Sequence, residues 1–201
     1  MYDKKIVIRS IQRVEIPEAA ALVGRATHKL PVTSAVLKGN GDRERLRVEA
    51  MWKVVFEHLP GNVIVAKKDG KILGVMRFAR SPDCQVSVFN GLKISPLMLK
   101  ALGGSSLRML KWIFTLSKHD PKQSHWHIDP IAVLPEMQRQ GVGSLLMQHF
   151  CRHVDRLGEP GYLETDRKEN LDFYRKFGFS VSGQTEIFGL STWFMWREPF
   201  G

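Results

Sequence analysis

One stretch, residues 125–150, limits what this chain can fold into more than any other. A strand-like segment, 125–134, leads through a polar turn, 135–140, into a helix that starts at Gly141-Val142-Gly143. The turn holds no Ser, Thr, Asp or Asn, so the first N–H groups of the helix lack an ordinary side-chain cap. The apolar residues of the helix recur on one helical face: Val142, Leu145, Leu146, Phe150 and Val154.

Gly141 and Gly143 stand beside these uncapped N–H groups and carry no side chain that would block an approaching ligand. Free N–H groups, the positive end of the helix dipole and an open backbone together favour an anion. The stretch therefore predicts a binding site for a phosphate or pyrophosphate. An ordinary helix end that binds water is the alternative.

Length and charge limit the possible partners. The chain has 201 residues, enough for one sizeable core, and a net charge of +10, which favours anionic partners. Its basic residues are scattered without a run of five, so we expect no nucleic-acid partner. Residues 94–116 are apolar but contain too many charges for a membrane span, and we expect no membrane partner.

The two cysteines, Cys84 and Cys151, lie far apart and form no metal-type pair, which favours buried thiols in a reducing compartment. The N-terminal residues lack the apolar run of a signal peptide, so we expect a cytoplasmic protein.

The remaining pattern mixes strands and helices. We expect strands at 5–10, 62–67, 71–80, 162–165, 179–184 and 192–197, with Asp69-Gly70 as a tight turn. Helices are expected at 17–30, 42–59 and from Ser105 or Ser106 to about 118, with a loop at 31–41 and a loop with some helix at 81–104. A short helix follows Asp166, which has capping-box spacing to Glu169, and stops at Gly178. The simplest interpretation is one α/β (α+β) domain over residues 1–201, with helices on both faces of a mixed sheet.

Two motifs carry a resemblance to a known family. Gln138-Arg139-Gln140-Gly141-Val142-Gly143 follows the strand Ile131-Ala132-Val133 and matches a Q/R-x-x-G-x-G/A pattern. The segment Asn170-Leu171-Asp172-Phe173-Tyr174, with Gly178-Phe179 after it, matches the ending of the same family. Over about residues 126–197 the chain resembles the GNAT (Gcn5-related N-acetyltransferase) superfamily. Tyr162-Leu163-Glu164-Thr165 and Thr192-Trp193 look closest to its puromycin N-acetyltransferase-like branch.

The resemblance implies a GNAT fold with about six or seven strands and a substrate-side insertion at 81–118. It implies acetyl-CoA as cofactor, and transfer of its acetyl group to a primary amine of a small molecule by direct attack in a ternary complex. A protein or peptide amine is an alternative acceptor, and a non-catalytic CoA-binding regulator is a further possibility. We expect a monomer or homodimer. The implied cofactor-binding residues are Ile131, Ala132, Val133, Arg139, Gln140, Gly141, Val142, Gly143, Ser144, Asn170 and Tyr174.

The resemblance also implies roles in catalysis. The Val133 N–H would donate to the thioester oxygen, and Tyr174 would protonate the leaving thiolate as general acid. A packed aromatic is the alternative role for Tyr174. The general base stays open between His127, Glu164, Asp129 and water.

The walls of the acceptor site are expected from residues 31–42, 81–118 and 184–192. Because these segments are apolar and hold few acids, they favour an apolar or aromatic amine. The apolar residues concerned are Met98, Leu102, Met109, Trp112 and Phe114.

His125-x-His127-x-Asp129 resembles the metal motif of metallo-β-lactamase-like hydrolases, and His149 and His153 could add ligands. The final His of that motif is replaced by Pro130. We therefore expect no metal in the site and keep a metal-dependent hydrolase only as an alternative.

Overall fold

A seven-stranded mixed sheet in the order β1-β2-β3-β4-β5-β7-β6 forms the centre of the computed structural model, which describes residues 5–85 and 88–200. Every neighbouring pair is antiparallel except β4 and β5, which are parallel. This confirms the expected mixed α/β fold. The strands are β1 (Val7–Ser10), β2 (Asn62–Lys68), β3 (Lys71–Arg80), β4 (Trp126–Val133), β5 (Gly161–Thr165), β6 (Ser180–Ile187) and β7 (Leu190–Arg197).

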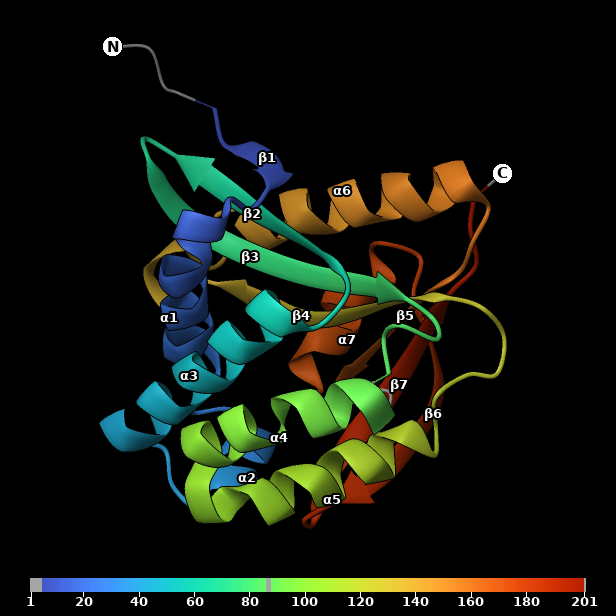
Figure 1. The fold of residues 1–201 in the computed structure, drawn as a ribbon. Helices are drawn as coiled ribbons and strands as arrows, with labels where there is room; N and C mark the ends of the chain where they lie inside the picture. Colours follow the sequence, from blue (N-terminus) through green and yellow to red (C-terminus); the bar gives the residue numbers. More distant parts are fainter. Residues whose placement is uncertain (1–4, 86–87, 201) are drawn as a thin grey trace.

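Helices cover both faces of the sheet (Figure 1). One apolar core lies between the sheet and α1 and α3, and a second lies between the sheet and α6 and α7. The α helices are α1 (Ile16–Thr27), α2 (Pro31–Leu37), α3 (Asp42–His58), α4 (Val88–Leu102), α5 (Ser106–Ser117), α6 (Val142–Leu157) and α7 (Glu169–Arg175).

The prediction of a loop at 31–41 is wrong, because α2 occupies its first half. Pro31 is the first residue of this helix. Asp166, which directly follows β5, caps the helix by accepting the Val32 N–H at 2.8 Å. For the same reason the predicted capping box is wrong: Asp166 serves α2, and α7 begins at Glu169 without a side-chain cap from any described residue. Long-range contacts have replaced local ones at both positions.

The helices between β3 and β4 lie beside α2 at one end of the molecule (Figure 1). α4 is the helix expected within 81–104, although it fills more of that segment than the predicted loop with some helix, and residues 86 and 87 of the predicted insertion lie outside the described residues. α5 starts at Ser106 as predicted, but without a cap from Ser105: the Ser106 hydroxyl instead donates to the Gly103 carbonyl at 2.7 Å. In residues 5–85 and 88–200, no helix combines the length and apolarity needed to cross a bilayer.

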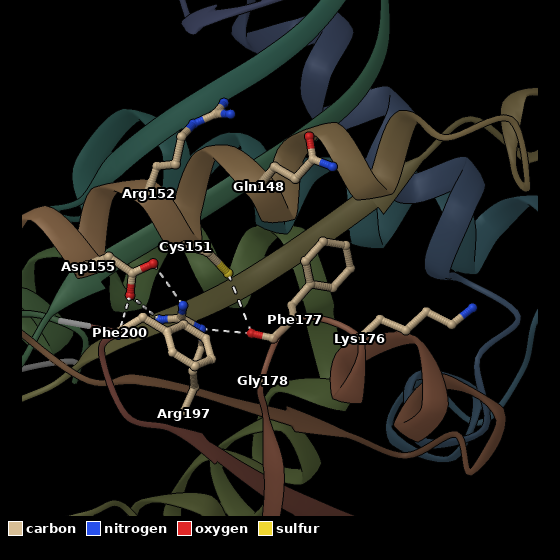
Figure 2. Close-up of a pocket in the computed structure, with 9 residues that line it drawn as sticks. All are labelled: Gln148, Cys151, Arg152, Asp155, Lys176, Phe177, Gly178, Arg197 and Phe200. Carbon is tan, nitrogen blue, oxygen red and sulfur yellow. Dashed lines mark hydrogen bonds and ion pairs between the residues drawn. The ribbon is translucent and has the colours of Figure 1, made fainter.

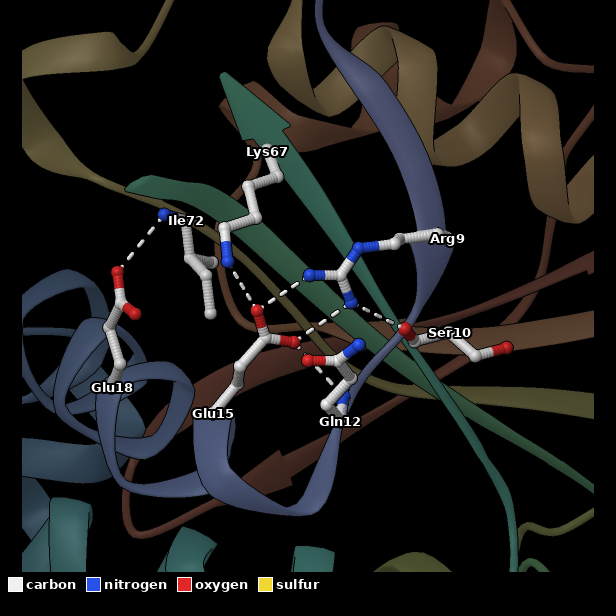
Figure 3. A network of polar contacts seen from close by, with 7 residues as sticks. All are labelled: Arg9, Ser10, Gln12, Glu15, Glu18, Lys67 and Ile72. Atoms are coloured by element: carbon white, nitrogen blue, oxygen red, sulfur yellow. Dashed lines mark hydrogen bonds and ion pairs between the residues drawn. The ribbon is translucent and has the colours of Figure 1, made fainter. Parts of the chain in front are cut away.

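A buried carboxylate ties the start of α1 to β1 and β2 (Figure 3). Glu15 accepts two hydrogen bonds from Arg9, at 2.6 and 2.8 Å, and a third from the Gln12 N–H at 3.0 Å. Lys67 of β2 donates to the same carboxylate. The hydrogen bond from Arg9 lowers the pKa of Glu15 to about 2. The hydrogen bonds from Lys67 and Gln12 contribute to this lowering, whereas burial of the carboxylate opposes the shift.

A bulge in β4 changes which side chains face which core. β3 advances two residues, from Met76 to Phe78, while β4 advances three, from Ile131 back to Ile128. Ile128 and Ile131 therefore both face the α6 core, although they are three positions apart, an odd offset that places side chains on opposite faces of a regular strand. The extra residue lies where the polar half of β4 meets its apolar half.

Candidate functional site

The N-terminus of α6 has the open geometry that the sequence predicts. Gly141 has φ 84°, a left-handed conformation that favours glycine, and open space surrounds the position of a Cβ atom. No side chain among the described residues caps the helix. A Cβ on Gly143 would come 3.5 Å from the Phe173 ring and 3.7 Å from the Val133 side chain, so glycine keeps this corner open. The residues present fit a pyrophosphate.

The residues on either side of Gly141 differ in their exposure and in the contacts that they make. Arg139 is exposed, with φ 61°, and Ser144 is half-buried. Gln140 donates its side-chain amide to the Glu136 carbonyl at 2.9 Å, which shapes the turn. Val142 is buried in the core beside the sheet, so it can meet a phosphate only through its N–H.

β4 and β5 part soon after they begin to pair. Within the described residues they pair only through Trp126 with Gly161 and His127 with Tyr162. Leu134 donates its N–H to the Leu73 carbonyl of β3. Because successive N–H groups of a strand point in opposite directions, the Val133 N–H faces the open edge on the β5 side.

The same alternation separates the other two predicted edge residues. The Ile131 backbone faces the open edge like that of Val133, whereas Ala132 lies opposite Val75 with its polar groups toward β3. The Val133 carbonyl already accepts the Gln138 side chain at 3.3 Å. Two N–H groups, of Ile131 and Val133, are thus directed toward a ligand that lies between the strands.

α7 brings the two remaining predicted residues to the end of β5. Asn170 donates to the Thr165 hydroxyl at 3.3 Å and so fastens α7 to that strand. The Tyr174 ring is buried against Phe173 and Phe179. Burial, and after it the nearby Asp166, raise the pKa of Tyr174 above its usual value, so the phenol keeps a proton that it can donate.

Two residues that the sequence offers as alternative bases form one pair. The His127 Nε2 lies 2.6 Å from the Glu164 Oε2, and both side chains are nearly buried, at 14% and 13% exposed. Burial opposes a charge on the ring, but Glu164 raises the pKa of His127 well above its usual value. Asp129, the third alternative, has an exposed side chain and accepts Arg77 at its main-chain carbonyl.

Two further polar residues, which sequence reasoning missed, lie against these histidines. The Cys84 Sγ is 3.9 Å from the His125 Nε2, and the Asp120 Oδ1 is 3.6 Å from the same nitrogen. Burial opposes protonation of His125, but Asp120, Cys84 and the Gln123 carbonyl raise its pKa to about 9. Burial also opposes ionisation of Cys84, yet the two histidines hold the pKa of its thiol below the usual value.

No local pattern identifies these two residues. Cys84 stands alone in a segment without clear periodicity, and Asp120 is indistinguishable from an ordinary turn residue before Pro121. Only the fold brings them together: the Ser81 N–H donates to the His125 carbonyl, which joins the turn after β3 to the segment before β4.

The histidines of α6 do not complete a site with those of β4. The His153 ring packs 4.6 Å from Trp126 and 5.3 Å from Phe78, both of which belong to the α6 core. His125 and His127 face the other side of the sheet, because they alternate with Trp126. The ligand set that includes His149 and His153 is therefore not formed.

Cys151 lines a surface hollow of about 260 Å³ on the second half of α6 (Figure 2). Its thiol donates to the Phe177 carbonyl, and burial raises the pKa of Cys151 to about 11. Beside it Arg197 binds both carboxylate oxygens of Asp155. Such a thiol is a poor nucleophile, which argues against an acetylated cysteine intermediate.

The three segments expected to wall the acceptor site meet around Arg108 of α5. Its guanidinium donates twice to the Ala35 carbonyl of α2, at 3.0 and 2.8 Å, and lies 4.3 Å above the Phe188 ring in the β6–β7 turn. The expected apolar wall is only partly present. Leu102 and Met109 belong to the core with α1 and α3, and Phe114 is 63% exposed.

Comparison with known proteins agrees with this geometry. The family model described as "Acetyltransferase (GNAT) family" matches residues 38–179, which is more than half of the chain. A peptidyl-lysine N-acetyltransferase, YjaB, from Salmonella typhimurium is 30% identical over 64 residues. That match covers 30% of this chain and 41% of the length of YjaB.

Solved structures share the fold. One from Corynebacterium glutamicum, titled as histone acetyltransferase HPA2 and related acetyltransferase, has a TM-score of 0.77 at 19% identity and covers 98% of both chains. A GNAT family acetyltransferase from Brucella melitensis, solved with acetyl-CoA, has a TM-score of 0.56 at 17% identity. It covers 98% of this chain and 88% of the other.

Proposed function

This chain belongs to the GNAT acetyltransferase family, and on that premise we propose that it acetylates the primary amine of a small molecule by direct attack in a ternary complex. It is an acyl-CoA-dependent N-acetyltransferase, and acetyl-CoA supplies the acetyl group as a thioester. The uncapped α6 N-terminus would hold the pyrophosphate, with Arg139 and Asn170 beside it. The Ile131 and Val133 N–H groups would bind the pantetheine arm as an added strand does.

The His127–Glu164 pair carries the proposal, because it lies where β4 and β5 part. Glu164 stabilises the protonated ring and so increases its affinity for a proton. Because the raised pKa keeps the ring protonated near neutral pH, only the unprotonated fraction of His127, which grows as the pH rises, would remove a proton from the substrate ammonium and free the nitrogen lone pair for attack.

The remaining groups act on the thioester. The Val133 N–H would donate to the carbonyl oxygen as negative charge develops there. As the C–N bond forms and the C–S bond breaks, Tyr174 would give its proton to the leaving sulfur. After attack the nitrogen still carries a second proton that it must lose, and this proton would return to the Tyr174 phenolate by way of solvent. The products are the amide and the free thiol of CoA, and the proton taken by His127 would pass to solvent.

The hydrogen bonds and the ring contact of Arg108 favour a small molecule over a peptide as the acceptor. α2, α5 and the β6–β7 turn are joined across the acceptor side, and a long peptide would need that side open. A lysine side chain of a protein is the second candidate, because the relative YjaB is named as a peptidyl-lysine acetyltransferase.

A thiol-release assay on wild type and Tyr174→Phe tests the proposal. We expect small primary amines to give a higher kcat/KM than lysine peptides. We expect Tyr174→Phe to lower kcat about 100-fold, within the range of general acids, with acetyl-CoA affinity nearly unchanged because the ring stays in place. An unchanged kcat would remove Tyr174 as the acid. Turnover of peptides alone would establish the second candidate instead.

A further inference from the structure

Four side chains from three separate segments converge on the acceptor side of β4. Cys84 comes from the turn after β3, Asp120 from the segment before β4, and His125 and His127 from β4 itself or its start. One candidate ligand atom from each lies within 4.8 Å of those of the other three. The His125 side chain is fully buried and that of Asp120 is only 7% exposed.

The separations leave room for an ion: the histidine–carboxylate contact is longer than a direct hydrogen bond, and the contact to sulfur is at the upper limit of one. His125 Nε2 is 3.6 Å from Asp120 Oδ1 and 3.9 Å from Cys84 Sγ. Hydrogen bonds between nitrogen and oxygen are about 2.7–3.2 Å long. Tetrahedral zinc, with bonds of about 2.0–2.3 Å, holds neighbouring ligand atoms about 3.3–3.6 Å apart. Small side-chain movements would bring all four to such a centre.

Both rings are oriented as metal-bound histidines are. The Nδ1 of His125 lies 2.8 Å from the Gln123 carbonyl, which must accept, so Nδ1 carries a proton; loss of the second ring proton on metal binding would leave the lone pair on Nε2, toward Asp120 and Cys84. His127 can donate through Nε2 to Glu164, which leaves a lone pair on Nδ1. A carbonyl or carboxylate on the second ring nitrogen is the usual outer partner of a histidine ligand.

A buried hydroxyl beside the cluster lacks a partner. The Tyr162 ring packs edge-on to both histidines, at 5.3 and 5.0 Å, and its hydroxyl makes no hydrogen bond to any described residue. An unpaired hydroxyl at this depth is costly unless another group completes the site. The Glu164 carboxylate is one acceptor close to this hydroxyl, and a metal-bound thiolate or carboxylate would supply another.

We propose that Cys84, Asp120, His125 and His127 bind a zinc-class divalent cation. One thiolate, one carboxylate and two neutral imidazoles balance the two charges of the ion, so the buried centre is neutral. The mixture of sulfur and imidazole favours zinc over magnesium or calcium, which prefer oxygen. The ion would also join the β3–α4 turn to β4.

Cobalt substitution tests the site without reference to acetyl transfer. Protein stripped with chelator and loaded with Co²⁺ should show the intense visible bands of tetrahedral cobalt and a thiolate-to-cobalt charge-transfer band, at one ion per chain. Cys84→Ser should abolish the charge-transfer band and weaken zinc binding by at least about 100-fold, beyond the loss seen for outer-shell changes.

Cys151→Ser is the matched control, because Cys151 is buried on α6 and contacts Phe177. It should keep the wild-type spectrum. A six-coordinate spectrum, wild-type affinity in Cys84→Ser, or loss of the band in Cys151→Ser would overturn the proposal. If Cys84→Ser fails to fold, Asp120→Asn provides the same affinity test.

The ion would occupy the His127 that the proposed function uses as proton acceptor, and this consequence rests on that function. Zinc should then inhibit acetyl transfer by wild type, and a chelator should restore it, whereas Cys84→Ser should resist. Zinc-loaded wild type with full activity would remove His127 as the base and leave the metal site intact. Absence of zinc binding would overturn the site and leave the proposed function intact.

Discussion

Replacing Gly74 by alanine should lower both the stability of the fold and the affinity of the proposed phosphate-binding site at the α6 N-terminus. Gly74 lies in β3 where α6 packs closest to the sheet. A Cβ there would come 2.9 Å from the Val142 Cγ1, 3.1 Å from the Leu146 Cδ1 and 3.2 Å from the Ala132 carbonyl oxygen. The Ala132 carbonyl is held by the sheet, so helix α6 must move away from β3 to make room for the Cβ. Val142, which the Cβ would meet, is the first residue of α6.

The magnitude follows from two opposing effects. Overpacking of a core costs about 1–3 kcal/mol, and alanine in place of glycine within a strand returns about 0.5–1 kcal/mol. The midpoints of these ranges give a net loss of about 1 kcal/mol, or roughly 2–4 °C in Tm for a chain of this size. Because the shift begins at the uncapped N–H groups, acetyl-CoA affinity should also fall, by about tenfold or 1.4 kcal/mol.

Differential scanning calorimetry and isothermal titration with acetyl-CoA measure the two effects. Gly104→Ala is the matched control, because a Cβ there meets nothing within 4 Å, and it should change neither quantity. If Gly74→Ala lowers Tm but leaves acetyl-CoA affinity unchanged, the packing of β3 against α6 does not affect the proposed anion site. An unchanged Tm would refute the overpacking itself.

Two other changes test ties elsewhere in the molecule. Glu15→Gln should lower Tm at pH 7 by a few degrees, because hydrogen bonds to charged groups contribute about 1.5–3 kcal/mol and Arg9 and Lys67 are partly exposed, at 32% and 23%. The pKa of Glu15 is about 2 in the folded protein against 4.5 for an unperturbed glutamate, so its stabilisation is complete above pH 4.5 and is lost as the pH falls toward 2; thermal scans of both proteins should converge over that range, and a constant difference would contradict the assignment. Arg108→Ala should free α2 from α5 and raise KM for the amine several-fold while acetyl-CoA affinity stays constant, and equal changes in both constants would argue against a role confined to the acceptor side.

The sequence predicts local features of the site well because their causes are local. The absence of a capping side chain between residues 134 and 141 removes every local cap, and no described residue from elsewhere in the chain supplies one. Gly141 follows from the same logic, since its φ of 84° is unfavourable for other residues. The Asp69-Gly70 turn, with φ of 50° and 81°, is correct for the same reason.

Features set by distant contacts were not predictable in this way. Asp166 has the spacing of a cap for its own helix, yet it binds the Val32 N–H, 134 residues away in sequence. Cys84 and Asp120 gain their positions only when the turn after β3 meets the start of β4. Neither spacing nor periodicity contains that information, because it depends on which strands become neighbours.

The bulge in β4 explains how one strand serves both chemistry and packing. Before it, Trp126 and Ile128 face α6, while His125 and His127 face the opposite side of the sheet, which is the proposed acceptor side. If the alternation continued unbroken, Val133 would point its side chain to the acceptor side. The extra residue reverses the alternation, so the Val133 side chain packs against the α6 core near Gly143. The N–H groups of the second half can then serve the cofactor edge while the side chains of the first half serve the amine, and deleting one residue at 129–130 should therefore abolish transfer even if the sheet still forms.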